Sequence, residues 1–214
     1  MAKHFVSNKD ESPDMFENRF LNFFSRVHWV VPLILYVPLI AYCLYLALST
    51  YNISILPMLG WMVAGMAAWT FAEYVLHRFV FHRELPGELG KRIHFIFHGV
   101  HHDFPMDSYR LVMPPPMSIP LAIIFYSLYT WLMGMGIGLV FFSGFTLGYL
   151  FYDMSHYAFH HANIKHPLFK KLKDHHMVHH FHDPDNGYGV SSIIWDHIFG
   201  TTFKLEKKSK VVSK

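Results

Sequence analysis

Ten of the 18 histidines in this sequence lie in four short clusters. They are His77 and His82; His98, His101 and His102; His156 and His160; and His176, His179 and His180. Neutral imidazole is the commonest metal ligand in proteins, and in three clusters the histidines lie three or four residues apart, where helical side chains share a face. Ten ligands are too many for one tetrahedral zinc, but they suit two metals with five or six nitrogen neighbours each. The spacing predicts a dinuclear, all-nitrogen metal site.

The type of ligand narrows the choice of metal. Nitrogen-rich sites without carboxylate or thiolate suit iron, copper or zinc better than magnesium or calcium. Two adjacent redox metals can share the activation of dioxygen, so we expect iron for activity and O2 as a co-substrate. Zinc is an alternative bound metal in the purified protein, because such ligands bind zinc more tightly than ferrous iron.

Carboxylates near the clusters are candidates to orient the ligating imidazoles through hydrogen bonds. The sequence offers six of them: Glu73, Asp103, Asp153, Asp174, Asp183 and Asp196. Asp153 stands out because Tyr149, Tyr152 and Asp153 precede the third histidine cluster at helical spacing. We call these three residues the stripe, and two roles for it are open. The three residues guide the polar head of a substrate to the metals, or Asp153 hydrogen-bonds a ligating imidazole.

The composition is typical of a membrane protein. Of 214 residues, 52% are hydrophobic and only 15% are charged, which is too apolar for a soluble domain of this length. The single cysteine, Cys43, excludes an intrachain disulfide and a paired-cysteine metal site. The first twenty residues are polar and acidic, so no secretory signal is evident and membrane insertion is expected to depend on internal spans.

Four apolar stretches are expected to span the membrane as two helical hairpins: residues 29–48, 53–76, 117–133 and 137–155. The first two are long enough to cross a hydrocarbon core of about 30 Å. The second pair is shorter, so we expect it to cross a thinned bilayer or to form a tighter hairpin. Each hairpin leads directly into a histidine cluster. The sequence therefore predicts an all-α integral membrane protein with four transmembrane helices and a helical cap that holds the two metals.

The basic residues set the orientation. All 18 lysines and arginines lie outside residues 28–76 and 111–155. By the positive-inside pattern, both termini, the cap and every histidine cluster are expected in the cytosol, at the inner membrane of a bacterium or the endoplasmic reticulum of a eukaryote. We attribute the net charge of +3 to this distribution of basic residues along the chain. No nucleic-acid partner is therefore expected.

Three segments follow from this layout. Residues 1–27 form a cytosolic N-terminal segment, in which FENRFLNFFSR is either a short amphipathic helix on the membrane surface or part of a disordered tail. Residues 28–204 contain the spans and the cap. Residues 205–214 form a basic tail that is either unfolded or lies on anionic headgroups.

Four stretches carry a resemblance to a known family: EYVLHRFVFH, HFIFHGVHHDFPMDSYRLVMPP, GYLFYDMSHYAFHH and WDHIFGT. They are similar to the fatty acid 2-hydroxylases that act on sphingolipid acyl chains, within the membrane di-metal superfamily that also holds sterol desaturases. The resemblance runs from about Glu73 to Thr202. It implies that residues 28–204 are a fatty acid hydroxylase domain and that the same ten histidines are its metal ligands.

The resemblance also implies an activity. A membrane monooxygenase of this kind hydroxylates a fatty acyl chain at C2, either free or sphingolipid-linked, with O2 and externally supplied electrons. Eukaryotic members of the family carry an N-terminal haem-binding cytochrome domain, whereas only 27 residues precede the first expected span here. We therefore expect the electrons to come from a separate cytochrome- or ferredoxin-type protein.

Two alternatives to this function are open at the level of sequence. An enzyme of the same superfamily would hydroxylate or desaturate a sterol or a carotenoid. A non-enzymatic membrane protein that binds or transports metal is the alternative from a different class. A transporter would need ligands at the bilayer midplane, whereas all ten histidines lie at or beyond the ends of the expected spans.

Overall fold

The computed structural model describes residues 5–83 and 85–203, and within them it contains helices and loops but no strand. Its helices are α1 (Arg19–Ser25), α2 (Val31–Ser49), α3 (Ile55–Leu76), η1 (His77–Phe81), α4 (Gly87–His94), η2 (Phe95–Gly99), α5 (Val100–Asp103), α6 (Pro115–Met133), α7 (Met135–His161), α8 (Pro167–Phe181) and α9 (Ile194–Phe199). The segments η1 and η2 are short π-helices. The all-α prediction is confirmed, and the predicted basic tail at 205–214 lies outside the described residues.

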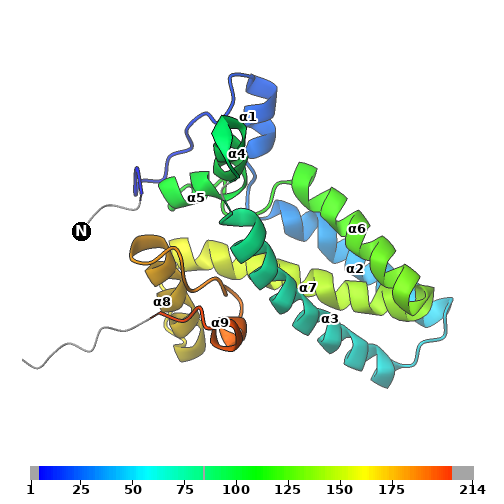
Figure 1. The fold of residues 1–214 in the computed structure, drawn as a ribbon. Coiled ribbons are helices and arrows are strands. Elements are labelled where there is room, and N and C mark those ends of the chain that lie inside the picture. Colours follow the sequence, from blue (N-terminus) through cyan, green and yellow to red (C-terminus); the bar gives the residue numbers. More distant parts are fainter. Residues whose placement is uncertain (1–4, 84, 204–214) are drawn as a thin grey trace, which may run out of the picture.

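Four helices are long and apolar enough to cross a membrane, as the sequence predicted: Val31–Ser49, Ile55–Phe81, Pro115–Met133 and Met135–His161. A helix of 19 residues measures about 28 Å, close to the thickness of the hydrocarbon core. They form two hairpins, and the smaller helices gather as a cap at one end of the bundle (Figure 1). Gly134 joins α6 to α7 with a φ of 73°, which glycine adopts without strain.

Helix α7 lies at the centre of the bundle. In the most apolar stretch of α7, 67% of the residues are buried. In that of α6 only 6% are buried, so α6 faces lipid along most of its length. Helices α3 and α7 pack with their backbones in contact. A Cβ atom on Gly144 would lie 2.1 Å from the carbonyl oxygen of Met62, and one on Gly65 would lie 2.2 Å from that of Phe141. Small residues at membrane-helix contacts allow this close approach.

Helix α7 is longer than the predicted span of residues 137–155, because it runs unbroken from Met135 to His161. Its 27 residues extend about 40 Å, so this helix needs neither a thinned bilayer nor a tighter hairpin. Polar residues after Phe151 do not end it, since Asp153, His156 and His160 are buried against the cap. The end of the apolar stretch is therefore not the end of the helix.

Residues 5–27 of the N-terminal segment pack against the cap and include a helix. Helix α1 begins after Asn18, whose side-chain oxygen accepts a hydrogen bond from the backbone N–H of Phe20 at 2.8 Å. Two backbone N–H groups near the start of the described chain, those of Val6 and Ser7, donate to the carbonyl of Asp103. This segment therefore belongs structurally to the cap, next to α4 and α5 (Figure 1).

Candidate metal centre

The cap and the ends of the spans bring the ten clustered histidines into two groups of five. In the structure the four sequence clusters become two spatial clusters. The first cluster consists of His77, His82, His98, His102 and His179, and the second of His101, His156, His160, His176 and His180. Within each cluster, one ring nitrogen from every histidine lies within 4.8 Å of the others. The ten residues are those that the sequence spacing selected.

The first cluster depends on the π-helical turn at the end of α3. His77 and His82 lie five residues apart, a spacing that would place them on different faces of an α-helix. In η1 the N–H of His82 instead donates to the carbonyl of His77 at 3.0 Å, an i to i+5 bond that widens the turn. The Nε2 atom of His77 lies 3.0 Å from that of His98, and the Nε2 atom of His82 lies 3.0 Å from that of His179.

The second cluster joins three helices. His156 and His160 share one face of α7, and across from them the Nε2 atoms of His160 and His176 lie 3.0 Å apart. Adjacent residues of α5 enter different clusters, His101 the second and His102 the first. The ring of His102 stacks on that of His180 with centroids 4.3 Å apart, so the two clusters adjoin.

Burial keeps these imidazoles neutral. Desolvation lowers the pKa of the cap histidines well below the ordinary value, and repulsion from neighbouring imidazoles lowers it further. This holds for His98, His101, His176, His179 and His180. A neutral imidazole offers one nitrogen lone pair to a metal.

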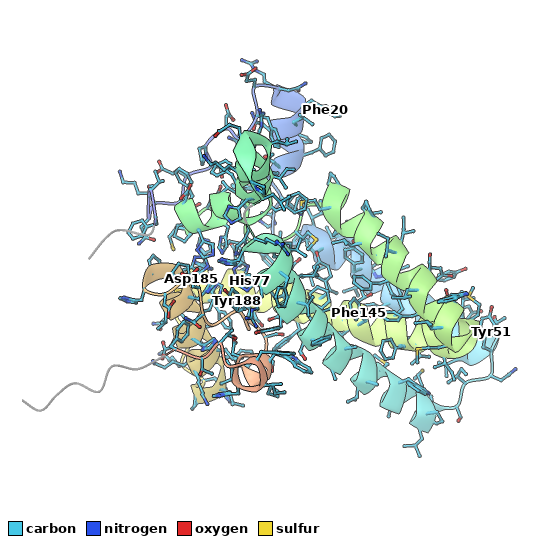
Figure 2. The ribbon with its side chains drawn as sticks, viewed as in Figure 1. Phe20, Tyr51, His77, Phe145, Asp185 and Tyr188 are labelled. Atoms are coloured by element: carbon cyan, nitrogen blue, oxygen red, sulfur yellow. The ribbon has the colours of Figure 1, made fainter. Side chains whose placement is uncertain are left out.

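Hydrogen bonds to the backbone fix which nitrogen is free. The Nδ1–H of His77 donates to the carbonyl of Tyr188 at 2.5 Å, and that of His179 donates to the carbonyl of Asn186 at 2.7 Å. Figure 2 shows His77 beside Tyr188 at the cap end of the bundle. In the second cluster, the Nδ1–H of His156 donates to the carbonyl of Leu111 at 3.0 Å. Because Nδ1 carries the proton in each case, Nε2 has its lone pair available for a metal.

The donor set fits a pair of transition-metal ions. Within the part of the chain that the structure describes, several buried ring nitrogens have no hydrogen-bond partner, including Nε2 of His101, His156 and His180. Buried polar atoms without partners are rare in folded proteins and need an explanation. Two ions coordinated by five neutral imidazoles each would satisfy these nitrogens.

The sequence model of the family described as fatty acid hydroxylase matches residues 62–201. This chain belongs to the fatty acid hydroxylase family. Dihydroceramide fatty acyl 2-hydroxylase FAH1 of Arabidopsis thaliana is 38% identical to it, over 94% of this chain and 85% of that relative. Fatty acid 2-hydroxylase of Mus musculus is 35% identical over 92% of this chain and 58% of its own length. The structure of full-length scs7p, with only its hydroxylase domain visible, has a TM-score of 0.82 at 37% identity and covers 88% of this chain and 71% of that one.

An apolar cavity of about 470 Å³ adjoins the histidines of this hydroxylase. Phe16, Phe20 and Phe24 line it from the N-terminal segment and α1, and His98 and His156 line it from the two clusters. Its lining also includes Arg110, Tyr152 and Asp153, so an apolar chain in it would meet polar groups close to the histidines. The contribution of α1 was not evident from the sequence, because nothing before the first span has a spacing related to the histidines.

The structure separates the three residues of the predicted stripe. Tyr152 and Asp153 line the large cavity, whereas Tyr149 lines a smaller neighbouring cavity of about 30 Å³. Asp153 is buried, and neither of its carboxylate oxygens has a hydrogen-bond partner within the described residues. Two of the three residues are therefore in place to contact a molecule in the large cavity.

Among the six candidate carboxylates, Glu73 and Asp196 bind the loop around Tyr188 instead of a clustered imidazole. Glu73 accepts a hydrogen bond from the backbone N–H of Val190 at 2.6 Å, and Asp196 accepts one from that of Tyr188 at 2.9 Å. Asp174 pairs with the exposed Lys170. Backbone carbonyls thus orient His77, His156 and His179, a role that the sequence analysis expected of carboxylates. These carbonyls could not have been identified from residue types in the sequence.

Proposed function

We propose that this protein hydroxylates fatty acyl chains at C2, with dihydroceramide or ceramide acyl chains as its substrate class. The observation that carries the proposal is a buried pair of five-histidine clusters that adjoins an apolar cavity of about 470 Å³. The family membership and the activities named for relatives such as FAH1 support the same reaction.

The ten clustered histidines would hold two metals, with iron as the active metal and zinc as an alternative occupant. Iron held there would supply O2 activation and insertion of one oxygen atom into a C–H bond, with the other oxygen leaving as water after two electrons from a donor and two protons are taken up. Burial of the clusters keeps bulk water from the reacting carbon.

The cavity residues would select and orient the acyl chain. Phe16, Phe24 and Phe97 offer apolar contacts along the chain. Tyr152 and Asp153 would meet the polar end of the lipid, where the carbonyl and C2 lie. Holding that end beside His98 and His156 places C2, rather than a mid-chain carbon, next to the metals.

The electrons would come from a separate cytochrome- or ferredoxin-type protein that meets the cap. The positive-inside distribution of lysine and arginine supports a cytosolic cap and cytosolic termini. The sterol and carotenoid alternatives are disfavoured because the similar relatives are named as fatty acid or fatty acyl hydroxylases. Metal transport is disfavoured because the clusters lie at the cap end of the spans.

Lipid analysis tests the proposal. Cells that express the protein with a compatible electron donor should accumulate 2-hydroxy acyl chains, and cells with His98→Ala should not, because His98 lies in the first cluster. Parallel feeding of a labelled free fatty acid and a labelled ceramide identifies the form that reacts. Hydroxylated sterol or carotenoid in the absence of any 2-hydroxy acyl product would contradict the proposal.

A further inference from the structure

In each histidine cluster, one or two of the five imidazoles are oriented by a separate loop of the cap. The first loop, residues 186–191, supplies the carbonyls that accept from His77 and His179 of the first cluster. The second loop, residues 104–112, supplies the carbonyl of Leu111, which accepts from His156 of the second cluster. These bonds fix the tautomer and ring orientation of the histidines, so the positions of the loops matter for metal binding.

Two buried carboxylates hold the first loop. The Asp196 oxygens accept from the N–H groups of Tyr188 and Gly189, each at 2.9 Å. Glu73 accepts from the N–H groups of Val190 at 2.6 Å and Ser191 at 2.9 Å. Both acids are at most 3% exposed, and a buried N–H group that loses its acceptor is costly. Four consecutive N–H groups of the loop are therefore bound by two side chains.

A different carboxylate holds the second loop. Asp107, which is 1% exposed, accepts from the N–H of Tyr109 at 3.0 Å and pairs with Arg110 at 3.0 Å. The N-terminal segment completes this arrangement, because the hydroxyl of Ser12 donates to Asp107 and Arg110 donates to the carbonyl of Pro13 at 2.5 Å. Ser12 and Pro13 lie outside residues 62–201, which the family model matches.

From these contacts we propose that the two metal positions have separate supports. Glu73 and Asp196 are positioning residues for the first cluster, and Asp107, Ser12 and Arg110 are positioning residues for the second. They act through the loops rather than as ligands, although Asp196 also accepts from the Thr201 hydroxyl at 2.8 Å and lies 3.2 Å from the Nε2 atom of His175 on α8. This inference rests on the proposed metal centre, and it makes the N-terminal segment a part of the second metal site.

Metal retention measures this separation. The variants are Asp196→Asn and Asp107→Asn, because each carboxylate accepts donors on both oxygens, so the new amide N–H₂ faces a donor whichever way it turns. Asp174→Asn is the matched control, since Asp174 is exposed and pairs only with Lys170 among the bonds described. The full-length protein is purified with zinc, exposed to a graded series of chelator concentrations, and assayed for metal per chain.

Two single-cluster backgrounds assign each loss to a site. His160→Ala removes one of the five second-cluster ligands, so metal in the second cluster should be lost to the chelator before metal in the first, and His82→Ala should do the reverse. In the His160→Ala protein, Asp196→Asn should weaken the remaining metal about 10- to 100-fold, the range seen when such supporting groups are lost, while Asp107→Asn should leave it unchanged. In the His82→Ala protein the two effects should be exchanged.

The outcomes are distinguishable. If both carboxylate variants weaken both metals equally, or weaken neither, the separate supports are refuted. If the unmodified protein retains fewer than two metals, the proposed dinuclear centre fails instead. Ser191→Ala and Ser12→Ala each remove one hydroxyl that donates to Glu73 or Asp107, and they carry the same site-selective prediction where the carboxylate variants do not fold.

Discussion

At the scale of residues, ten histidines supply the ring nitrogens of the candidate metal centre, and three loop carbonyls orient His77, His156 and His179. The ten histidines were identifiable because helical spacing gathers ligands that lie close in the chain, and the structure brings all ten together. The carbonyls of Leu111, Asn186 and Tyr188 were not identifiable, because every residue has a carbonyl and only tertiary folding selects these three. The position of Asp153 was partly predictable. Its helix face followed from the spacing, but the cavity that it lines did not.

Asp153→Asn and Tyr152→Phe distinguish the two roles that the sequence left for the stripe. Because both residues line the cavity and Asp153 binds none of the described histidines, we expect full metal content and about tenfold weaker apparent affinity for the acyl substrate. That change corresponds to about 1.4 kcal/mol, within the net range of a single hydrogen bond between neutral groups. Metal analysis and kinetics on one preparation measure both quantities.

Tyr149→Phe tests the neighbour whose hydroxyl reaches toward the Asp153 carboxylate from the smaller cavity. It should change the apparent affinity less than either of the other variants. If Asp153→Asn releases metal while substrate affinity is unchanged, Asp153 supports an imidazole and does not bind substrate.

At the scale of elements, the number and type of the helices followed from apolar stretches, but their ends did not. Helix α7 continues to His161 because its polar residues are buried by the cap, which the sequence does not display. The π-helical turn at His77–Phe81 likewise depends on the cap, where His77 and His82 must enter one cluster. Helix α1 illustrates a third case, because its helical form was one of two predicted alternatives whereas its place in the cavity wall was not predicted.

Neighbouring phenylalanines of α1 test its role as a cavity wall. Phe24 lines the cavity, whereas Phe23 does not and is 73% exposed. Phe24→Ala should raise the apparent KM for long acyl chains roughly three- to tenfold, because an apolar contact of part of a phenylalanine contributes about 1 kcal/mol. Phe23→Ala should leave that KM unchanged in detergent micelles. Equal effects of the two variants on chain-length preference would exclude α1 from substrate binding.

At the scale of the whole molecule, exposed apolar side chains continue from the spans onto the cap. Helices α1 and α9 lie on opposite sides of the bundle near its cap end (Figure 1), and Phe20 of α1 is 67% exposed although it also lines the cavity. Phe23 of α1 is 73% exposed, and Ile198 of α9 is 60% exposed. The ring of Trp195 in α9 contacts that of Phe71 in the span α3 in a tilted arrangement, with centroids 4.7 Å apart, so α9 adjoins a surface that faces lipid. An apolar helix face in this position is typical of one that lies in the membrane interface.

Spin labels can measure the depth of both helices. Cys43 is the only cysteine and is buried, so Cys43→Ser provides a background in which one cysteine at position 23, 198 or 185 carries a nitroxide. In lipid nanodiscs, we expect labels at 23 and 198 to collide with oxygen, which partitions into lipid, more than with a water-soluble nickel chelate. A label at 185 should behave in the opposite way, because Asp185 is an exposed residue of the cap. If positions 23 and 198 prove as accessible to nickel as position 185, α1 and α9 face water, and the cap is held at the membrane by its four spans alone.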